Sequence, residues 1–135
     1  MIEYLVIKTS EPRQVLDITE RVAKTLQEAK GDRGICHVFV AHTTAAVTTA
    51  DLDPGTDLDM LDAFEVMAPK LKYRHPHDPA HTPEHILASL IGPSVTIPVE
   101  TGELLLGEWQ RIVLVEFSGP RERRVIVTFQ SDVSA

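Results

Sequence analysis

Short apolar segments separated by turn residues make up most of this sequence. The segments are rich in Val, Ile, Thr and Phe, residues that favour strands, and Gly- or Pro-containing turns lie between several of them. The predicted strands are residues 2–8, 35–41, 43–49, 94–99, 103–106, 109–117 and 123–130. Strands that follow one another along the chain, joined by short turns, favour a largely antiparallel sheet.

The first predicted helix begins near residue 17, where the apolar residues follow helical spacing. The apolar residues that recur at this spacing are Ile18, Val22, Leu26 and Ala29. The predicted start is a capping box, in which the Asp17 carboxylate accepts a hydrogen bond from the amide three residues on and Glu20 reaches back. Gly31 supplies the stop signal.

Two further helices are predicted in the middle of the chain. One covers about residues 57–68 and is closed by Pro69. Its predicted buried side chains are Leu58, Leu61 and Phe64. The other begins with Thr82 as N-cap and Pro83 at the first helical position, and Gly92 ends it. With three helices inserted among the strands, residues 1–135 are predicted to form a single α+β domain.

Composition and charge restrict the function classes. The formal net charge of −7 argues against broad nucleic-acid binding, which needs clustered Lys and Arg. Apolar runs such as 112–115 are far too short to span a bilayer, and the N-terminus does not resemble a signal peptide. Cys36 is the only cysteine and lies in an apolar run, which fits a buried thiol and a cytoplasmic location.

The third helix carries the first candidate site residues. Its predicted apolar face consists of Ile86, Leu87, Leu90 and Ile91. His85 and Ser89 fall together on the opposite face, beside Ala88. That face is either simply solvated or the wall of a polar pocket, and the nearby histidines favour the pocket.

Histidines are also the candidate metal ligands. His75, His77, His81 and His85 lack the compact spacing on one helix that marks a zinc site. A mixed site that draws on His85, a loop histidine such as His75, and His42 stays open.

Two other segments carry candidate polar groups. The segment His42-Thr43-Thr44 joins two predicted strands, and its hydroxyls either bind a phosphate or carbonyl or simply favour strand. Glu116 lies in an apolar strand, where a charge is costly unless it is paired. Either Arg123 or Arg124 on the next strand satisfies it, or Glu116 belongs to the site.

The order of several short motifs resembles one known family. The motifs are His42-Thr-Thr-Ala-Ala, Asp53-Pro54, Asp59, His85 four residues before Ser89, Leu90-Ile91-Gly92-Pro-Ser, Ile97-Pro98-Val99, Gly102, Leu106-Gly107-Glu108-Trp109-Gln110, Glu116 and Gly119-Pro120-Arg121. Together they are similar to the YjbQ-like family over nearly the whole chain. The sequence departs from the family pattern at Ala50-Asp51 and at His77-Asp78-Pro79.

The resemblance implies a homotrimer of α+β subunits with a weak, secondary thiamine-phosphate synthase activity. That transferase reaction joins a pyrimidine pyrophosphate to a thiazole phosphate and releases pyrophosphate. The implied pocket lies near a subunit boundary. The expected catalytic residues are His42, His85 and Glu116, and the expected substrate-binding residues are Thr43, Ser89, Trp109 and Gln110.

In this interpretation the histidines donate hydrogen bonds or carry protons, because imidazole titrates near neutral pH. Trp109 stacks on a flat heterocycle, and Gln110 orients it. A pyrophosphate leaving group in an acidic protein calls for a divalent cation, Mg²⁺ or Zn²⁺, and the candidate ligands are His42, His75 and His85. A non-catalytic metal- or metabolite-binding trimer and a metal-dependent hydrolase are the alternatives.

Overall fold

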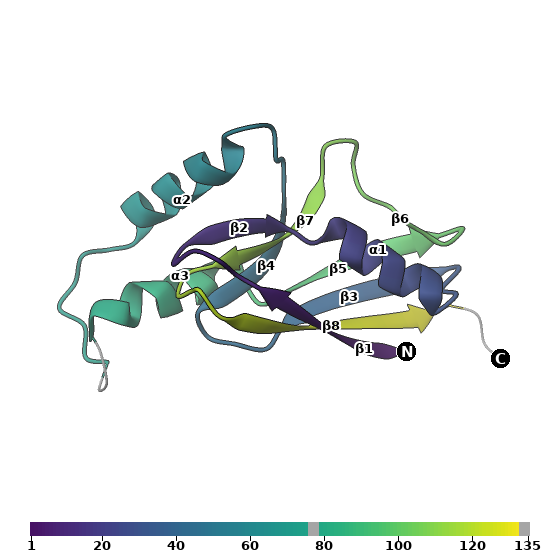
Figure 1. Cartoon of the computed structure of the whole chain (residues 1–135), viewed down its shortest axis with the longest axis horizontal. Coiled ribbons are helices and arrows are strands. Elements are labelled where there is room, and N and C mark those ends of the chain that lie inside the picture. The colour runs from purple at the N-terminus through teal and green to yellow at the C-terminus, as the bar shows by residue number, and fades with distance from the viewer. Residues whose placement is uncertain (76–78, 133–135) are drawn as a thin grey trace.

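Two antiparallel sheets form the frame of the molecule in the computed structural model, which describes residues 1–75 and 79–132 (Figure 1). The five-stranded sheet has the order β1-β8-β3-β5-β6, and the three-stranded sheet has the order β2-β7-β4. The strands of the first sheet are β1 (Ile2–Lys8), β3 (Gly34–Val40), β5 (Ser94–Glu100), β6 (Glu103–Leu104) and β8 (Glu122–Ser131). Those of the second are β2 (Gln14–Asp17), β4 (Ala45–Ala50) and β7 (Arg111–Glu116).

Three α-helices accompany these sheets, so the predicted α+β class is confirmed. They are α1 (Thr19–Glu28), α2 (Thr56–Met67) and α3 (Thr82–Ile91), and a short 3-10 helix, η1 (Pro79–His81), precedes α3. In Figure 1, α1 lies over the five-stranded sheet, whereas α2 and α3 lie at the opposite end of the molecule. Within the described residues, no helix has both the length and the apolar character needed to cross a membrane.

Strand β7 is buried on both faces and joins the two parts of the core. Ile112 and Leu114 pack into the cluster that contains α1, and Val113 and Val115 pack into the cluster that contains α3. Successive side chains of β7 therefore alternate between the two clusters.

The predicted capping box at the start of α1 is wrong. The helix begins at Thr19, whose amide donates to the Asp17 carboxylate at 3.0 Å, only two residues away. Glu20 does not reach back, because its carboxylate accepts a hydrogen bond from Arg111 at 3.0 Å. Asp17 belongs to β2, a four-residue strand that the sequence pattern did not predict. Strand β2 forms because β7 pairs with it, which is a long-range contact.

The predicted buried faces of α2 and α3 need correction. No residue of α2 is fully buried, and Leu58 is exposed. On α3 the buried residues are Leu87 and Ala88, while Leu90 is 67% exposed. The small Ala88 packs with Ala46 of β4, so the helix is turned toward its Ala side rather than its Leu90 side. The N-cap position of α3 is His81 rather than Thr82, and Thr82 makes no side-chain cap.

Candidate functional site

A cavity of about 270 Å³ lies between the β3–β4 loop and α3. Its lining residues are His42, Thr43, Ala45, His85, Ala88, Ser89 and Pro93. The structure therefore brings together four of the predicted site residues: His42, Thr43, His85 and Ser89. The α3 face predicted to carry His85 and Ser89 does line a pocket. It does so because Ala88 between them packs closely on β4.

The imidazole of His42 has a defined hydrogen-bonding pattern. Its Nδ1 accepts from the Thr44 amide at 3.1 Å and lies 3.1 Å from the Thr44 hydroxyl. Burial lowers the pKa of His42, and the positive charges of Arg123 and Arg121 lower it further. A backbone amide can only donate, so Nδ1 is the acceptor and the proton of the neutral ring lies on Nε2.

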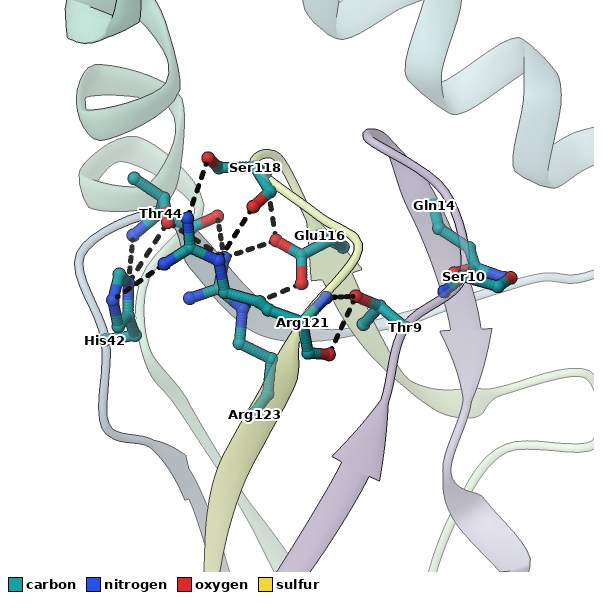
Figure 2. A network of polar contacts seen from close by, with 9 residues as sticks. All are labelled: Thr9, Ser10, Gln14, His42, Thr44, Glu116, Ser118, Arg121 and Arg123. Carbon is teal, nitrogen blue, oxygen red and sulfur yellow. Dashed lines mark hydrogen bonds and ion pairs between the residues drawn. The ribbon is translucent and has the colours of Figure 1, made fainter.

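Arg121 directs a second donor at the same place. Its Nη1 lies 3.5 Å from His42 Nε2, and its Nε donates to the Ser118 carbonyl at 2.8 Å (Figure 2). The backbone of Arg121 is held by Thr9, whose hydroxyl accepts from the Arg121 amide at 3.0 Å and donates to its carbonyl at 3.1 Å. An arginine nitrogen is always a donor, so two N–H groups face each other at the rim, where His42 lines the cavity and Arg121 lies next to His42 outside the lining.

The turn that places Arg121 requires a glycine. A Cβ on Gly119 would lie 2.3 Å from the Glu11 carbonyl oxygen and 2.7 Å from the Thr9 hydroxyl. The Gly119 amide donates to the Pro12 carbonyl at 3.0 Å, and the Gly119–Pro120 peptide is cis. The close approach of this turn to the β1–β2 connection fixes where Arg121 leaves the backbone.

Beneath this rim lies a buried ion pair. Arg123 Nε donates to Glu116 Oε2 at 2.7 Å, and Arg123 Nη2 also donates to Glu116 Oε1. The side chains are 1% and 0% exposed, respectively. Burial alone would raise the pKa of Glu116, but hydrogen bonds from Arg123 and from the Ser118 amide outweigh it and leave the pKa below its ordinary value. Arg123 Nη2 also donates to the Thr44 hydroxyl at 2.8 Å, which links the pair to His42 (Figure 2).

The ion pair shows which arginine neutralises Glu116. Arg123 satisfies its charge, whereas Arg124 lies over the Tyr4 ring at 5.6 Å. Glu116 is completely buried and is not among the residues that line the cavity, and its contact with the cavity side runs through Arg123 and Thr44. Within the described residues, Arg123 Nη1 has no hydrogen-bond partner.

The expected metal ligands do not assemble into a site. The His75 and His85 rings stack with their centroids 4.9 Å apart and their planes 16° apart. Among residues 1–75 and 79–132, however, no three His, Cys, Asp or Glu side chains are placed so as to hold a metal ion. The predicted set of His42, His75 and His85 is therefore not assembled within one chain. The departure at residues 77–78 lies outside the described residues.

Trp109 and Gln110 lie away from this cavity. Arg111 pairs with Ala50 at one end of β4, and Glu116 pairs with Ala45 at the other. At about 3.3 Å per residue, the two ends are about 17 Å apart. Gln110 donates to the Thr49 hydroxyl at 3.2 Å, and Trp109 is 69% exposed. The residues predicted to form one site therefore lie in two groups. One group is at the Ala45–Glu116 end of the β4–β7 pair, and the other is at the Ala50–Arg111 end.

Trp109 lines a separate hollow of about 310 Å³. Its other lining residues are Asp17, Asp51, Leu52, Asp53, Glu108 and Arg111. Within the described chain, the tryptophan is neither in the core nor beside the histidines.

The sequence matches the family model described as UPF0047 protein YjbQ-like over residues 3–132. This chain belongs to the YjbQ family. It is 39% identical to a UPF0047 protein of Archaeoglobus fulgidus, over 91% of this chain and 96% of that protein. It is 37% identical to UPF0047 protein YugU of Bacillus subtilis, over 91% and 94%.

Solved YjbQ structures share the architecture described above. A YjbQ/UPF0047 family protein from Clostridium acetobutylicum superposes with a TM-score of 0.86 at 38% identity, and covers 95% of this chain and 99% of its own. A YbjQ-like protein of unknown function from Sulfolobus solfataricus gives 0.90 at 30% identity, over 98% and 97%. The YjbQ motif residues His42, Trp109 and Glu116 therefore lie in a fold that the family shares.

The sequence alone did not identify several residues that build the rim. Thr9 and Ser118 gain their roles only from contacts with Arg121, which for Thr9 lies 112 residues away in the chain. Arg121 appeared only in the motif Gly119-Pro120-Arg121 and was not among the expected site residues.

Proposed function

We propose that the cavity between His42 and His85 binds the phosphate of a small phosphorylated heterocycle, and that the chain uses it for a weak transfer of the thiamine-phosphate-forming type. The observation that carries this proposal is the pair of donors at the rim. The nitrogens Nε2 of His42 and Nη1 of Arg121 lie 3.5 Å apart. Two donors repel each other, and a phosphate oxygen that accepts from both relieves this and forms charge-assisted hydrogen bonds.

The size of the cavity fits this class of ligand. About 270 Å³ is close to the lower end of the range for small-molecule sites, so it accommodates one phosphate with a small ring better than a large cofactor. Thr43 and Ser89 add hydroxyls that can donate to phosphate oxygens. In a chain of net charge −7, the positive charge of Arg121 beside His42 is the more important for attracting an anion, because Arg123 is neutralised by Glu116.

The proposed chemistry needs charge stabilisation more than a nucleophile. In the proposed transfer, the thiazole nitrogen forms a bond to the pyrimidine-side carbon that carries the pyrophosphate, the carbon–oxygen bond breaks, and its electron pair goes to the leaving oxygen. Donors fixed beforehand at that oxygen stabilise the growing charge. His42 and Arg121 supply such donors, and His85 on the facing helix is positioned to carry a proton. No step is assigned to a metal ion, because the three candidate ligands do not converge within one chain.

A binding experiment tests the anion site directly. Titration calorimetry with thiamine phosphate should show that Arg121→Gln and His42→Gln each weaken binding about tenfold, since each removes one charge-assisted or directed hydrogen bond. Arg124→Gln is the matched control, because Arg124 lies over Tyr4 instead. Equal affinity in wild type and Arg121→Gln would refute the site.

Turnover distinguishes an enzyme from a binder. The two substrates of thiamine-phosphate synthesis are mixed with the protein, and pyrophosphate release is measured with and without Mg²⁺ or Zn²⁺. We expect slow release that His85→Ala abolishes. If the protein binds the substrates but releases no pyrophosphate under all of these conditions, its function is non-catalytic binding.

The second candidate function is metal binding, favoured by the stacked imidazoles of His75 and His85. Stacked rings direct their nitrogen lone pairs side by side, so one ring has to turn before both can bind one ion, and a third ligand has to come from outside the described set or from another copy. Calorimetry with Zn²⁺ should then show binding that His75→Ala removes and Ser89→Ala does not. Unchanged binding in His75→Ala would exclude this pair.

We also propose the homotrimer that the family resemblance implies. The face of the five-stranded sheet opposite α1 exposes Ile2, Tyr4 and Val6, which are apolar side chains on an edge strand. Exposed apolar side chains in neighbouring positions are typical of subunit contacts. Light scattering should give three times the chain mass, and a mass near 15.0 kDa would contradict the trimer.

A further inference from the structure

A second cavity, about 530 Å³ in volume, lies between the end of α2 and the start of α3. In Figure 1 these helices lie near each other at one end of the molecule. None of its lining residues belongs to the His42 cavity. The apolar lining residues are Ala68, Pro69, Leu71, Tyr73, Pro79, Ala80 and Pro83. The charged ones are Arg13, Glu65, Lys70, Lys72 and Glu84.

On one side of this cavity, two opposite charges already form an ion pair. Arg13 Nη2 donates to Glu84 Oε1 at 3.2 Å, which ties the β1–β2 connection to the first turn of α3. The Glu84 side chain is mostly buried, so its charge is compensated locally by Arg13. This pair therefore adds no net charge to the cavity.

The remaining charges favour an anion. Lys70 and Lys72 make no ion pair with any residue that the structure describes, and both are exposed. Besides these lysines and the Arg13–Glu84 pair, Glu65 is the one charged residue among the described lining residues. The described lining thus carries a net positive charge in a chain of net charge −7. A positive, partly enclosed region in an acidic protein concentrates anions at that place.

The apolar lining determines what the anion must carry. Leu71 is exposed although it is a large apolar side chain, and it lies between the two lysines in the sequence. Tyr73 and the prolines 69 and 83 offer flat or rigid apolar surface, and proline surface is ordered at little entropic cost. Inorganic phosphate or acetate would leave this surface in contact with water. A ligand with both an apolar body and an anionic head covers it.

We propose that this cavity binds an amphipathic carboxylate, with its hydrocarbon body against Leu71 and Tyr73 and its head between Lys70 and Lys72. The volume lies within the ordinary range of small-molecule sites. The ligand enters from the α2–α3 end and leaves the His42 cavity free.

The test uses decanoate, below its micelle concentration, as the probe in titration calorimetry. Wild-type protein should bind decanoate, and the double variant Lys70→Gln/Lys72→Gln should bind it about tenfold more weakly, as expected for two lost charge-assisted contacts. Lys8→Gln/Lys24→Gln is the matched control, because it changes the net charge equally at exposed positions outside the cavity. Leu71→Ser should also weaken decanoate binding, because it removes an apolar contact with the hydrocarbon chain.

Two further ligands separate the contributions of body and head. Acetate has the head without the body and should not bind, whereas decyltrimethylammonium has the body with a positive head and should bind at least about tenfold more weakly than decanoate. Arg121→Gln and His42→Gln should leave decanoate binding unchanged, so this test is independent of the phosphate site. Absent decanoate binding, equal loss in both double variants, or equal affinity for the cation would overturn the proposal.

Discussion

The two ends of β7 each carry an arginine–carboxylate contact, but they place it in opposite surroundings. At one end, Arg123 and Glu116 are almost completely buried and share hydrogen bonds with Thr44. At the other, Arg111 donates to Asp17 at 2.7 Å, and both side chains are about one-third exposed. A buried charge is held in one geometry because every alternative is costly, whereas an exposed charge has water as an alternative partner. The site that needs fixed donors lies at the buried end.

The largest effect should come from breaking the buried pair on one side only. Arg123→Met leaves Glu116 buried without a counter-charge, which costs about 3–5 kcal/mol of unfolding free energy. Urea denaturation measures this. The double variant Arg123→Met/Glu116→Leu should recover most of the loss, because an apolar pair needs no compensation. If the single variant is as stable as wild type, the pair does not hold the structure together.

The same double variant tests what the pair does for the site. It removes the hydrogen bond from Arg123 to the Thr44 hydroxyl that also contacts His42. We therefore expect a folded protein with weakened thiamine phosphate binding. Full binding in that variant would show that His42 is positioned without help from Arg123.

Acid should reveal the next difference between the two ends. The pKa of Glu116 is lowered in the folded state, so its stabilising contribution is present above the unfolded pKa of about 4.3 and is lost as pH falls through the lower folded pKa. Hydrogen bonds from Thr19 and Arg111 likewise lower the pKa of Asp17 against the opposing effect of its own burial.

Urea midpoints measured from pH 6 to pH 3 distinguish the two carboxylates. Wild-type stability should fall across this window. Glu116→Gln should flatten the fall more than Asp17→Asn does, because the Glu116 pair is shielded from solvent. A steeper fall in Glu116→Gln than in wild type would mean that its folded pKa is raised, opposite to the geometry.

The exposed pair should contribute much less. Arg111→Gln removes contacts to Asp17 and Glu20 and should cost no more than about 1 kcal/mol, since exposed ion pairs are screened and entropically costly. Raising NaCl to about 1 M, where the Debye length is about 3 Å, should bring wild type and Arg111→Gln closer together in stability. It should leave the cost of Arg123→Met nearly unchanged. A cost for Arg111→Gln that salt does not alter would show that packing, not charge, is lost there.

The sequence predicted those features that depend on local pattern. It predicted the α+β class and the three helices, because each follows from spacing within one segment. It also predicted that His85 and Ser89 share a face, which holds whatever the helix packs against. It could not predict β2, which is four residues long and depends on its partner β7.

Other features depend on how elements that are distant in the sequence pack on each other. The sequence pattern predicted these features wrongly or missed them. Leu90 was expected in the core, but α3 approaches β4 through Ala88, and a small residue allows that approach where a leucine would not. Arg121 reaches His42 only because Gly119 packs against Glu11, a contact over 108 residues of chain that no local signal contains. Placing Trp109 beside His42 ignored the length of the strand between the two regions.

The smallest stability effect is expected at the exposed end, for Trp109→Ala. Trp109 is 69% exposed and lies outside β7, so its removal creates no core cavity and should change the unfolding free energy by less than about 0.5 kcal/mol. As the only tryptophan, it reports on this end of the sheet alone. Its emission should be that of a solvated indole and should be quenched by acrylamide in the folded protein. Phosphate at the His42 end should leave it unaltered, because the two ends are separated by the length of β4. If thiamine phosphate changes the emission while inorganic phosphate does not, the heterocycle reaches Trp109, and the two ends meet only across a subunit contact.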